Sequence, residues 1–343
     1  MKIEIVTTPN EELKETGFGT LKACHSVLDS INKLGHDVKL NVCRSLNDLA
    51  LIVNRKPDLV ILAVKYISID NENDIWLSEY FAEHEINYSG SPREVLKFDS
   101  DKVLAKSYLM KRGIKSAKYF TAIPGQYKCE ADLPVAFPLF LKPLDAANGN
   151  GIDDLSLVTN FSEFKSKIQS LFAAFNMPVL AEEYLDGREF SVALIKTEGS
   201  KLVVSAVEII PPQSTNGLRI LGEKAKKEDS EEIKKIDDQK MLNEVSKLAV
   251  DAYARLGIWD FGRIDIKTNK RGQCYFMEAN LVPGMTSGTS YFPRACEIAN
   301  ELTYDEVIQL IVEKGISRAT YAKSLAIPPV ITGNTGEKRV AAM

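Results

Sequence analysis

The sequence has little of what marks several classes of protein. Its five cysteines stand singly, without a C-x-x-C pair, so we expect no disulfide framework and a reducing, cytoplasmic environment. Three widely separated histidines give no sign of a histidine metal cluster. No apolar run approaches the roughly 18 residues that span a bilayer, and the acidic start is unlike a signal peptide. A formal net charge of −4 argues weakly against a nucleic-acid partner, and we expect no membrane partner either.

The 343 residues suffice for two or three domains. In the first part of the chain, strand-like segments (1–6, 36–42, 58–64) alternate with helical ones (20–34, 46–53). The segment DLVILAV at 58–64 is apolar throughout, as is typical of a parallel strand buried on both faces. We therefore predict a small α/β domain with a parallel sheet.

After a predicted helix over 101–112, strand-like runs follow one another with few helices between them, which indicates an antiparallel sheet in an α+β domain. These runs are 119–123, 137–142, 179–184, 189–196 and 201–210, with a helix over 161–172. The polar stretch 211–239 predicts a solvated loop with an exposed helix face, although long loops also form active-site lids. The remaining predicted elements are a helix over 241–256, strands over 261–267 and 273–279, and a last helix over 304–313, with no clear periodicity after 317.

Four polar side chains fall on the last two predicted strands. Arg263 and Asp265 share one face of the first strand, and Glu278 and Asn280 repeat that spacing on the next. If the strands pair as a hairpin, Asp265, Glu278 and Asn280 converge as the oxygen ligands that Mg²⁺ prefers. Arg263 would then lie where a fixed cation stabilises a transferring phosphoryl group. A surface hairpin with ordinary charges is the alternative, and the pattern alone favours neither.

The segment LVPGMTS at 281–287 is a turn built on Pro-Gly, which lets backbone N–H groups approach a ligand closely. With the preceding strands it reads GRIDI…YFMEANLVPGMTS, and this stretch, 262–287, strongly resembles the D-alanine–D-alanine ligase family of the ATP-grasp superfamily. The resemblance runs over about 88–315.

The resemblance implies an ATP-grasp fold, with α/β and α+β parts and the nucleotide held between the central and C-terminal domains. The implied division is an N-terminal α/β domain with a small parallel sheet (1–95), a central α+β ATP-binding domain (96–185), a C-terminal domain (186–317) with a lid loop at about 211–239, and a tail (318–343).

Phosphate contacts are implied for two lysines and a glycine-rich loop. Lys102 at the head of a helix and Lys142 at the end of a strand match the family's two phosphate-binding lysines. Gly149 and Gly151 follow Lys142, and such a loop can fold over phosphates because its N–H groups are unobstructed. Gly-x-Gly alone is a weak signal. Asn148 stands where the family has a serine.

Nucleoside contacts are implied for the segment AEEYLDGREF. In the family, backbone groups and the first glutamate of the pair bind adenine, which points to Glu182 and to the backbone from Glu183 to Leu185. Adjacent residues of a strand face opposite sides, so only one glutamate side chain can face the nucleotide. Glu189 stands at the family's ribose-binding carboxylate.

Four departures from the family concern the substrates rather than ATP. The first is Asn148. The family's N-terminal glycine-rich segment is replaced by TTPNEELKETGFGT, where Glu15 or Glu12 is a candidate acidic replacement. The lid tyrosine motif is absent, and RILGEKAKK stands there, with Lys224 as the candidate lid lysine. The segment GTSYFP after PGMTS is one residue longer than in the family.

Ser287, Ser290 and Arg294 are the candidates for binding a substrate carboxylate near that longer segment. Arginine pairs bidentately with carboxylates, although a surface position beside Glu297 is an equally good explanation of Arg294.

The resemblance implies a ligase that uses ATP and Mg²⁺, with two ions expected and Mn²⁺ as a substitute. It phosphorylates one substrate's carboxylate to an acyl phosphate, which a second substrate's amine attacks. Arg263 and the N–H of Gly284 would stabilise the tetrahedral intermediate. Because the amino-acid pocket departs from the family, we expect amino-acid-like substrates other than two D-alanines. An authentic D-alanine–D-alanine ligase and a non-catalytic ATP-binding regulator are the alternatives, and the resemblance suggests a homodimer.

Overall fold

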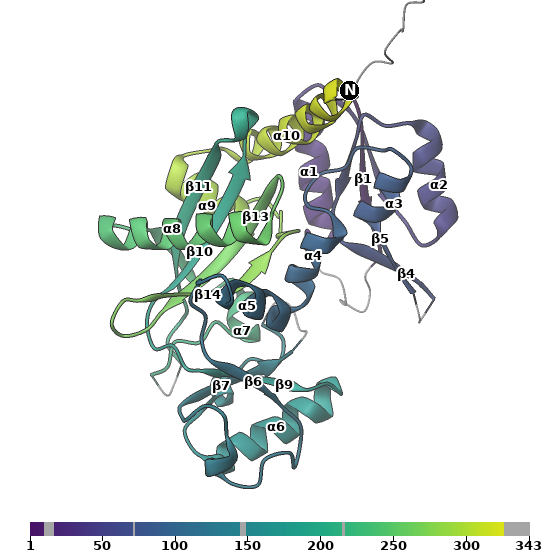
Figure 1. Ribbon diagram of the computed structural model, residues 1–343. Helices are drawn as coiled ribbons and strands as arrows, with labels where there is room; N and C mark the ends of the chain where they lie inside the picture. The colour runs from purple at the N-terminus through teal and green to yellow at the C-terminus, as the bar shows by residue number, and fades with distance from the viewer. Residues whose placement is uncertain (10–16, 71–72, 145–148, 215–216, 326–343) are drawn as a thin grey trace, which may run out of the picture.

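The computed structural model describes residues 1–9, 17–70, 73–144, 149–214 and 217–325. Figure 1 shows three regions in chain order, namely a small N-terminal sheet with its helices, a central region around α6, and a larger C-terminal sheet. Among the described residues, no helix has both the length and the apolar character needed to cross a membrane.

The N-terminal region is a three-stranded parallel sheet in the order β2-β1-β3, which confirms the predicted α/β arrangement. All four residues of β3 are buried, in agreement with its apolar sequence. An additional hairpin and helix follow the sheet and were not predicted. The elements are β1 (Lys2–Thr7), α1 (Leu21–Lys33), β2 (Asp37–Val42), α2 (Leu46–Arg55), β3 (Leu59–Leu62), β4 (Tyr66–Asp70), β5 (Asn73–Trp76) and α3 (Leu77–Glu83).

The central region is an antiparallel sheet in the order β6-β9-β7-β8, covered by α6. Two short helices lead into it from the N-terminal region, where the sequence predicted only the second. The elements are α4 (Arg93–Ser100), α5 (Lys102–Met110), β6 (Tyr119–Ala122), β7 (Leu139–Pro143), β8 (Leu157–Val158), α6 (Phe161–Phe175) and β9 (Val179–Glu183).

The C-terminal region is a second antiparallel sheet, in the order β12-β11-β10-β13-β14. The predicted antiparallel pairing is therefore confirmed, but the strands divide between two sheets instead of forming one. The elements are β10 (Glu189–Lys196), β11 (Leu202–Ile210), α7 (Glu223–Glu228), β12 (Glu232–Lys235), α8 (Gln239–Leu256), β13 (Phe261–Thr268), β14 (Cys274–Asn280), α9 (Tyr291–Asn300) and α10 (Tyr304–Leu325).

Two predictions about irregular segments need correction. The charged stretch 211–239 contains a helix, α7, as predicted, but it also contains strand β12, which was not predicted and pairs with β11 at the sheet edge. Helix α10 continues to Leu325, well past the predicted end at 313. The predicted tail therefore begins inside a helix, and only 326–343 lie outside the described residues.

The hydrophobic core joins the first and last regions of the chain. One buried cluster includes Ile3 and Ile5 of β1 together with Val192 of β10 and Ile264 of β13. The central region has a separate core, formed by the faces of β6, β7 and β9 that pack on α6. The central core lies within the domain predicted for 96–185, but α4 and α5 at the start of that range pack in the shared core, so the predicted boundaries stay a prediction. The other face of the N-terminal sheet packs in a further buried cluster with α2 and α3.

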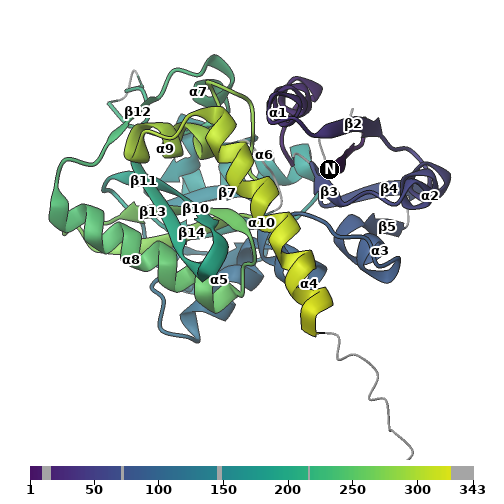
Figure 2. The same cartoon turned by 90° about the horizontal axis from the view of Figure 1, so that it is seen from above.

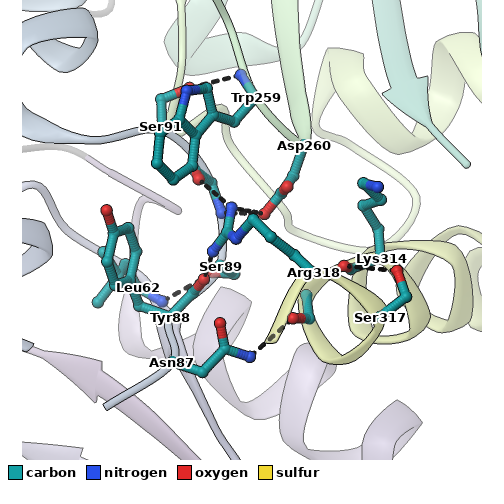
Figure 3. Close-up of polar contacts among 12 residues, drawn as sticks. Leu62, Asn87, Tyr88, Ser89, Ser91, Trp259, Asp260, Lys314, Ser317 and Arg318 are labelled. Carbon is teal, nitrogen blue, oxygen red and sulfur yellow. Dashed lines mark hydrogen bonds and ion pairs between the residues drawn. The ribbon is translucent and has the colours of Figure 1, made fainter. Parts of the chain in front are cut away.

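Helix α10 packs against the shared core and connects the two regions that form it. Figure 2 shows it running between the C-terminal sheet and the N-terminal region. In Figure 3, Arg318 reaches from this helix to Asp260 Oδ2 at 2.7 Å and to the carbonyl oxygens of Gly90, at 3.0 Å, and Tyr88. The guanidinium also lies 4.9 Å from the Trp259 ring centroid. Because the Asp260 side chain is only 1% exposed, this ion pair holds three separate segments at a buried junction.

Candidate active site

The strand pair β13–β14 brings the predicted metal ligands together. Asp265 lies opposite Glu278, and Arg263 lies opposite Asn280. Asn280 Nδ2 donates to Asp265 Oδ2 at 3.0 Å, and Ser191 Oγ on β10 donates to Asp265 Oδ1 at 2.7 Å. The predicted hairpin is confirmed, whereas the metal-binding role of these side chains stays a prediction.

Arg263 is fixed beside these carboxylates. Its Nε and Nη2 donate to the two oxygens of Asp265, each at 2.9 Å. Burial works against the charge, but Asp265 and Glu278 hold the pKa of the guanidinium above its usual value. The guanidinium also lies 5.4 Å from the centroid of the Tyr291 ring. Arg263 is therefore a permanent, oriented cation.

Four cationic side chains act on the carboxylate of Glu278. Burial raises the pKa of this carboxyl group, but the neighbouring charges overcome that effect and lower it to about 2. The cations come from four separate elements, namely Lys102 at the start of α5, Lys142 on β7, Lys226 on α7 and Arg263 on β13. Such a concentration of positive charge suits a ligand that carries several negative charges.

Lys226, two residues after the predicted Lys224, is the α7 lysine whose charge acts on Glu278. Lys224 is exposed, whereas Lys226 is partly buried and its charge acts on Glu278. Helix geometry explains the difference, because residues two apart on a helix point to roughly opposite sides. The role of Lys224 stays a prediction, and Lys226 is a second candidate on the same helix.

Behind Lys142 lies a buried group of three charges. Glu182 Oε1 pairs with Lys106 Nζ at 2.8 Å, and Glu182 Oε2 pairs with Lys142 Nζ at 2.6 Å. Burial raises the pKa of Glu182, but the two lysines outweigh it and bring the pKa to about 2. Lys106 is also held by Ser116 Oγ at 3.1 Å. Glu182 thus fixes the position of Lys142, and the predicted adenine contact would have to share this carboxylate.

The other predicted nucleoside contacts lie on the link from β9 to β10. Glu183 points away from Glu182, since its Oε2 accepts a hydrogen bond from the backbone N–H of Lys118 at 3.4 Å. Leu185 is buried, and Glu189 pairs with Lys267 across β10 and β13. The opposite orientation of the two glutamates is confirmed, while their nucleotide contacts stay predictions.

The glycine-rich loop packs against the start of α7. Gly149 and Gly151 have φ values of +73° and +74°, which favour glycine. A Cβ on Gly149 would lie 3.1 Å from the Gly222 carbonyl carbon, and a Cβ on Gly222 would lie 2.5 Å from the Ile152 carbonyl oxygen. The two loops can therefore touch only because both lack side chains there. This contact brings α7 over the loop that follows Lys142.

The loop after β14 is held by Asp99 on α4. Asp99 Oδ2 accepts hydrogen bonds from the backbone N–H of Leu281 at 2.5 Å and of Val282 at 3.3 Å. Its other oxygen pairs with Lys65 at 2.8 Å, so the N-terminal region helps to position this loop. A Cβ on Gly284 would lie 2.9 Å from Ser290 Oγ, which leaves room for glycine alone.

The predicted substrate residues of this loop differ in their contacts. Ser290 Oγ accepts a hydrogen bond from the backbone N–H of Thr286 at 2.9 Å, so this hydroxyl helps to shape the loop. Ser287 is exposed and Arg294 is partly buried. Neither serine is brought into contact with Arg263 in the described structure, and the substrate roles stay predictions.

Several residues of this site were missed by the sequence analysis. Lys106, Asp99, Glu231 and Tyr291 come from separate elements, and only the folded chain brings them to the site. In the sequence, the one indication of a role for these residues is that they are polar side chains inside otherwise regular segments. This indication is weak. Asn148, Glu12 and Glu15 lie outside the described residues.

Comparison with known proteins agrees with this geometry. A family model described as "D-ala D-ala ligase C-terminus" matches residues 110–313. The chain is 26% identical to a D-alanine–D-alanine ligase of Aquifex aeolicus, over 85% of this chain and 94% of that protein. It is 24% identical to the corresponding ligase of Gloeobacter violaceus, over 92% of this chain and 100% of that one.

Solved structures show the same fold. A D-alanine–D-alanine ligase from Bacillus anthracis, complexed with ATP, has a TM-score of 0.72 at 18% identity, covering 94% of this chain and 99% of that one. A D-Ala:D-Ser ligase from Enterococcus faecalis has a TM-score of 0.67 at 20% identity, covering 92% and 99%.

Proposed function

Because the chain belongs to the D-alanine–D-alanine ligase family, we propose that it is an ATP- and Mg²⁺-dependent ligase that joins the carboxylate of one amino-acid-like substrate to the amine of another. The observation that carries this proposal is the convergence of Lys102, Lys142, Lys226 and Arg263 on Glu278. The ATP-grasp fold and the C–N ligase class follow from the family and the structural likeness.

A nucleoside triphosphate fits the charge of this site. Two of the four cations already pair with carboxylates other than Glu278, namely Lys142 with Glu182 and Arg263 with Asp265, and these ion pairs hold them in position for a polyanion. The phosphates of ATP would neutralise the remaining charge, with Lys142 held in place by Glu182. Backbone N–H groups of the loop at Gly149 and Gly151 would lie over the phosphates.

The donor set fits Mg²⁺. Asp265 and Glu278 face each other across the strand pair, and Asn280 adds an amide oxygen. Among the described residues, no group of three or more histidine, cysteine or carboxylate side chains is arranged as a metal site, so phosphate oxygens would have to complete the shell. When bound, Mg²⁺ would offset negative charge on the transferring phosphoryl group. We propose two ions, and Mn²⁺ as a substitute, from the resemblance to the family alone.

The residues of the chain would act around the transferring group as follows. Arg263 donates hydrogen bonds from a fixed orientation to the charge that develops when the phosphoryl group moves to the carboxylate and when the amine attacks the acyl phosphate. The N–H of Gly284 donates to the oxygen of the tetrahedral intermediate. Lys226 would approach the phosphates from α7, so closure of α7 would also exclude water from the acyl phosphate.

The substrates are proposed to be amino acids other than a pair of D-alanines, because the segments that flank this centre depart from the family. Candidate contacts are Ser287, Ser290, Arg294 and the segment around Glu15. A D-alanine–D-alanine ligase is the second candidate, favoured by the names of the relatives in A. aeolicus and G. violaceus. A homodimer is proposed from the family alone.

A phosphate-release assay tests the function. Purified protein with ATP and Mg²⁺ is screened against pairs of D- and L-amino acids, with D-alanine alone among the conditions. We expect full turnover only with the correct pair, and its loss in Arg263→Ala. Turnover with D-alanine alone would establish the second candidate. If ATP hydrolysis and product formation survive intact in Arg263→Ala, the assigned role of Arg263 is wrong.

A further inference from the structure

Glu231 lies between α7 and β12, and among the described residues only one of its two carboxylate oxygens has a hydrogen-bond partner. The residue is 7% exposed. The Tyr291 hydroxyl donates a hydrogen bond to Glu231 Oε1. Within the described parts of the chain, the other oxygen, Oε2, is buried without a hydrogen-bond partner. Since a buried carboxylate oxygen without a donor is costly, Glu231 has an unused capacity to bind a donor group.

Tyr291 connects this carboxylate to the active site. Its ring lies 5.4 Å from the Arg263 guanidinium, and its hydroxyl reaches Glu231. The charges of Glu231, Arg263 and Asp265 all act on the Tyr291 phenol, whose pKa is raised by burial and by the hydrogen bond to Glu231. The phenol therefore keeps its proton and donates it. Tyr291 therefore contacts both the carboxylate of Glu231 and the guanidinium of Arg263, which takes part in the proposed reaction.

The missing partner of Glu231 is best matched by a cation. Arg263 does not fill this role in the structure, because its Nε and Nη2 donate to Asp265 and Glu231 Oε2 has no hydrogen-bond partner among the described residues. A neutral donor such as a hydroxyl would complete the hydrogen bonding but leave the carboxylate charge uncompensated. An ammonium or guanidinium group provides both the hydrogen bond and the opposite charge, which is the stronger combination in a buried setting.

We propose that Glu231 and Tyr291 form a binding site for a positively charged nitrogen that one substrate carries away from the bond being formed. The substrate class is then a basic amino acid or a similar amine with a second cationic group. This inference rests on the proposed ligase function and narrows it. Glu231 acts as a specificity-determining residue, with Tyr291 orienting its carboxylate.

The test compares basic substrates with neutral ones of similar shape. Lysine and ornithine, in both enantiomers, are assayed for phosphate release against norleucine and norvaline, with ATP, Mg²⁺ and a range of second amino acids. Wild type should favour the basic member of each pair in kcat/KM. Glu231→Gln keeps the size and an acceptor for Tyr291 but removes the charge. It should lower that preference about ten- to hundredfold, mainly through KM, as expected for a lost hydrogen bond between charged groups.

Glu232→Gln is the matched control, because the neighbouring glutamate is exposed on β12 and should leave the preference unchanged. Thermal unfolding confirms that each variant is folded. The inference is overturned if wild type shows no preference for the basic member. It is also overturned if Glu231→Gln weakens lysine and norleucine equally, since Glu231 would then be a structural contact of α7 or a ligand of the α-ammonium group.

Failure of the ligase function is recognised separately. If no amino-acid pair supports turnover, calorimetric titration of lysine and norleucine into wild type with a non-hydrolysable ATP analogue still tests the cation site. Selective binding of lysine that Glu231→Gln abolishes would support the site, and its absence would overturn it.

Discussion

Replacing Lys226 by alanine tests whether α7 delivers a cation to the phosphates. Lys224 provides an internal control, because it lies on the same six-residue helix, has the same side chain and is exposed. Lys226 is among the cations that lower the pKa of Glu278. The two variants therefore lose equal charge and nearly equal helix propensity, and differ in which face of α7 has changed.

The size of the effect follows from Glu278. Its pKa of about 2, against 4.5 without the protein environment, corresponds to a net preference for the charged form of roughly 3 kcal/mol. Lys226 is one of the cations that oppose burial here, and a hydrogen bond between charged groups contributes about 1.5–3 kcal/mol. A triphosphate carries several charges, so losing Lys226 should cost about 2–3 kcal/mol, or roughly 30- to 150-fold in kcat/KM for ATP.

Steady-state phosphate release at saturating amino acids measures this loss, and calorimetry of ATP binding shows how much of it arises before the chemical step. Lys224→Ala should stay within about threefold of wild type. The reasoning is refuted if the two variants are equally impaired, or if Lys224→Ala is the worse of the two.

Three further outcomes follow from buried groups. Because the folded-state pKa of Glu182 is lowered to about 2 from 4.5, its ion pairs stabilise the fold above pH 4.5, and that contribution, roughly 3 kcal/mol, is lost as the pH falls towards 2. Urea unfolding of Glu182→Gln between pH 5 and 3 should show a flatter dependence than wild type; an unchanged slope would contradict it. Arg318→Ala leaves Asp260 buried and unpaired, and should lower the free energy of unfolding by about 3–5 kcal/mol in urea, against less than about 1 for Lys314→Ala. Gly151→Ala places a Cβ against the Phe175 ring at a residue with positive φ. The substitution should weaken both the stability of the fold and the binding of ATP by about 1–3 kcal/mol, as measured by urea unfolding and calorimetry. Wild-type values in both assays would show that the loop is not packed as described.

The parts of the site that lie on regular strands could be predicted from the sequence. The spacing of two between Arg263 and Asp265, and between Glu278 and Asn280, fixes one face of each strand whatever the rest of the fold does. Lys142 could be placed because it ends an apolar strand. In the same way, the apolar run of β3 was sufficient to predict a buried parallel strand.

The parts that depend on tertiary contact could not be predicted. Which face of α7 meets the site depends on how Gly222 packs against Ile152, so the two lysines of this helix, Lys224 and Lys226, could not be distinguished before the fold was known. Strand β12 is four residues long and highly charged, and it exists because β11 offers a free edge to pair with. Glu231 and Tyr291 are far apart along the chain and meet only when α9 packs on the C-terminal sheet.

The division of the hydrophobic core has a consequence for how the molecule opens. One face of the N-terminal sheet shares a core with the C-terminal sheet, and Arg318 joins the two regions, whereas β6, β7, β9 and α6 enclose a core of their own. The other face of the N-terminal sheet packs in a further cluster, but β1 and β3 contribute to both clusters and so couple them. Local unfolding should therefore occur in two cooperative units rather than three. Hydrogen exchange is expected to show the central region opening and closing as one body, while β1 and β13 exchange together with a common, higher opening free energy. The nucleotide that we propose for this protein would lie at the boundary between these two units, so its binding should slow exchange in both.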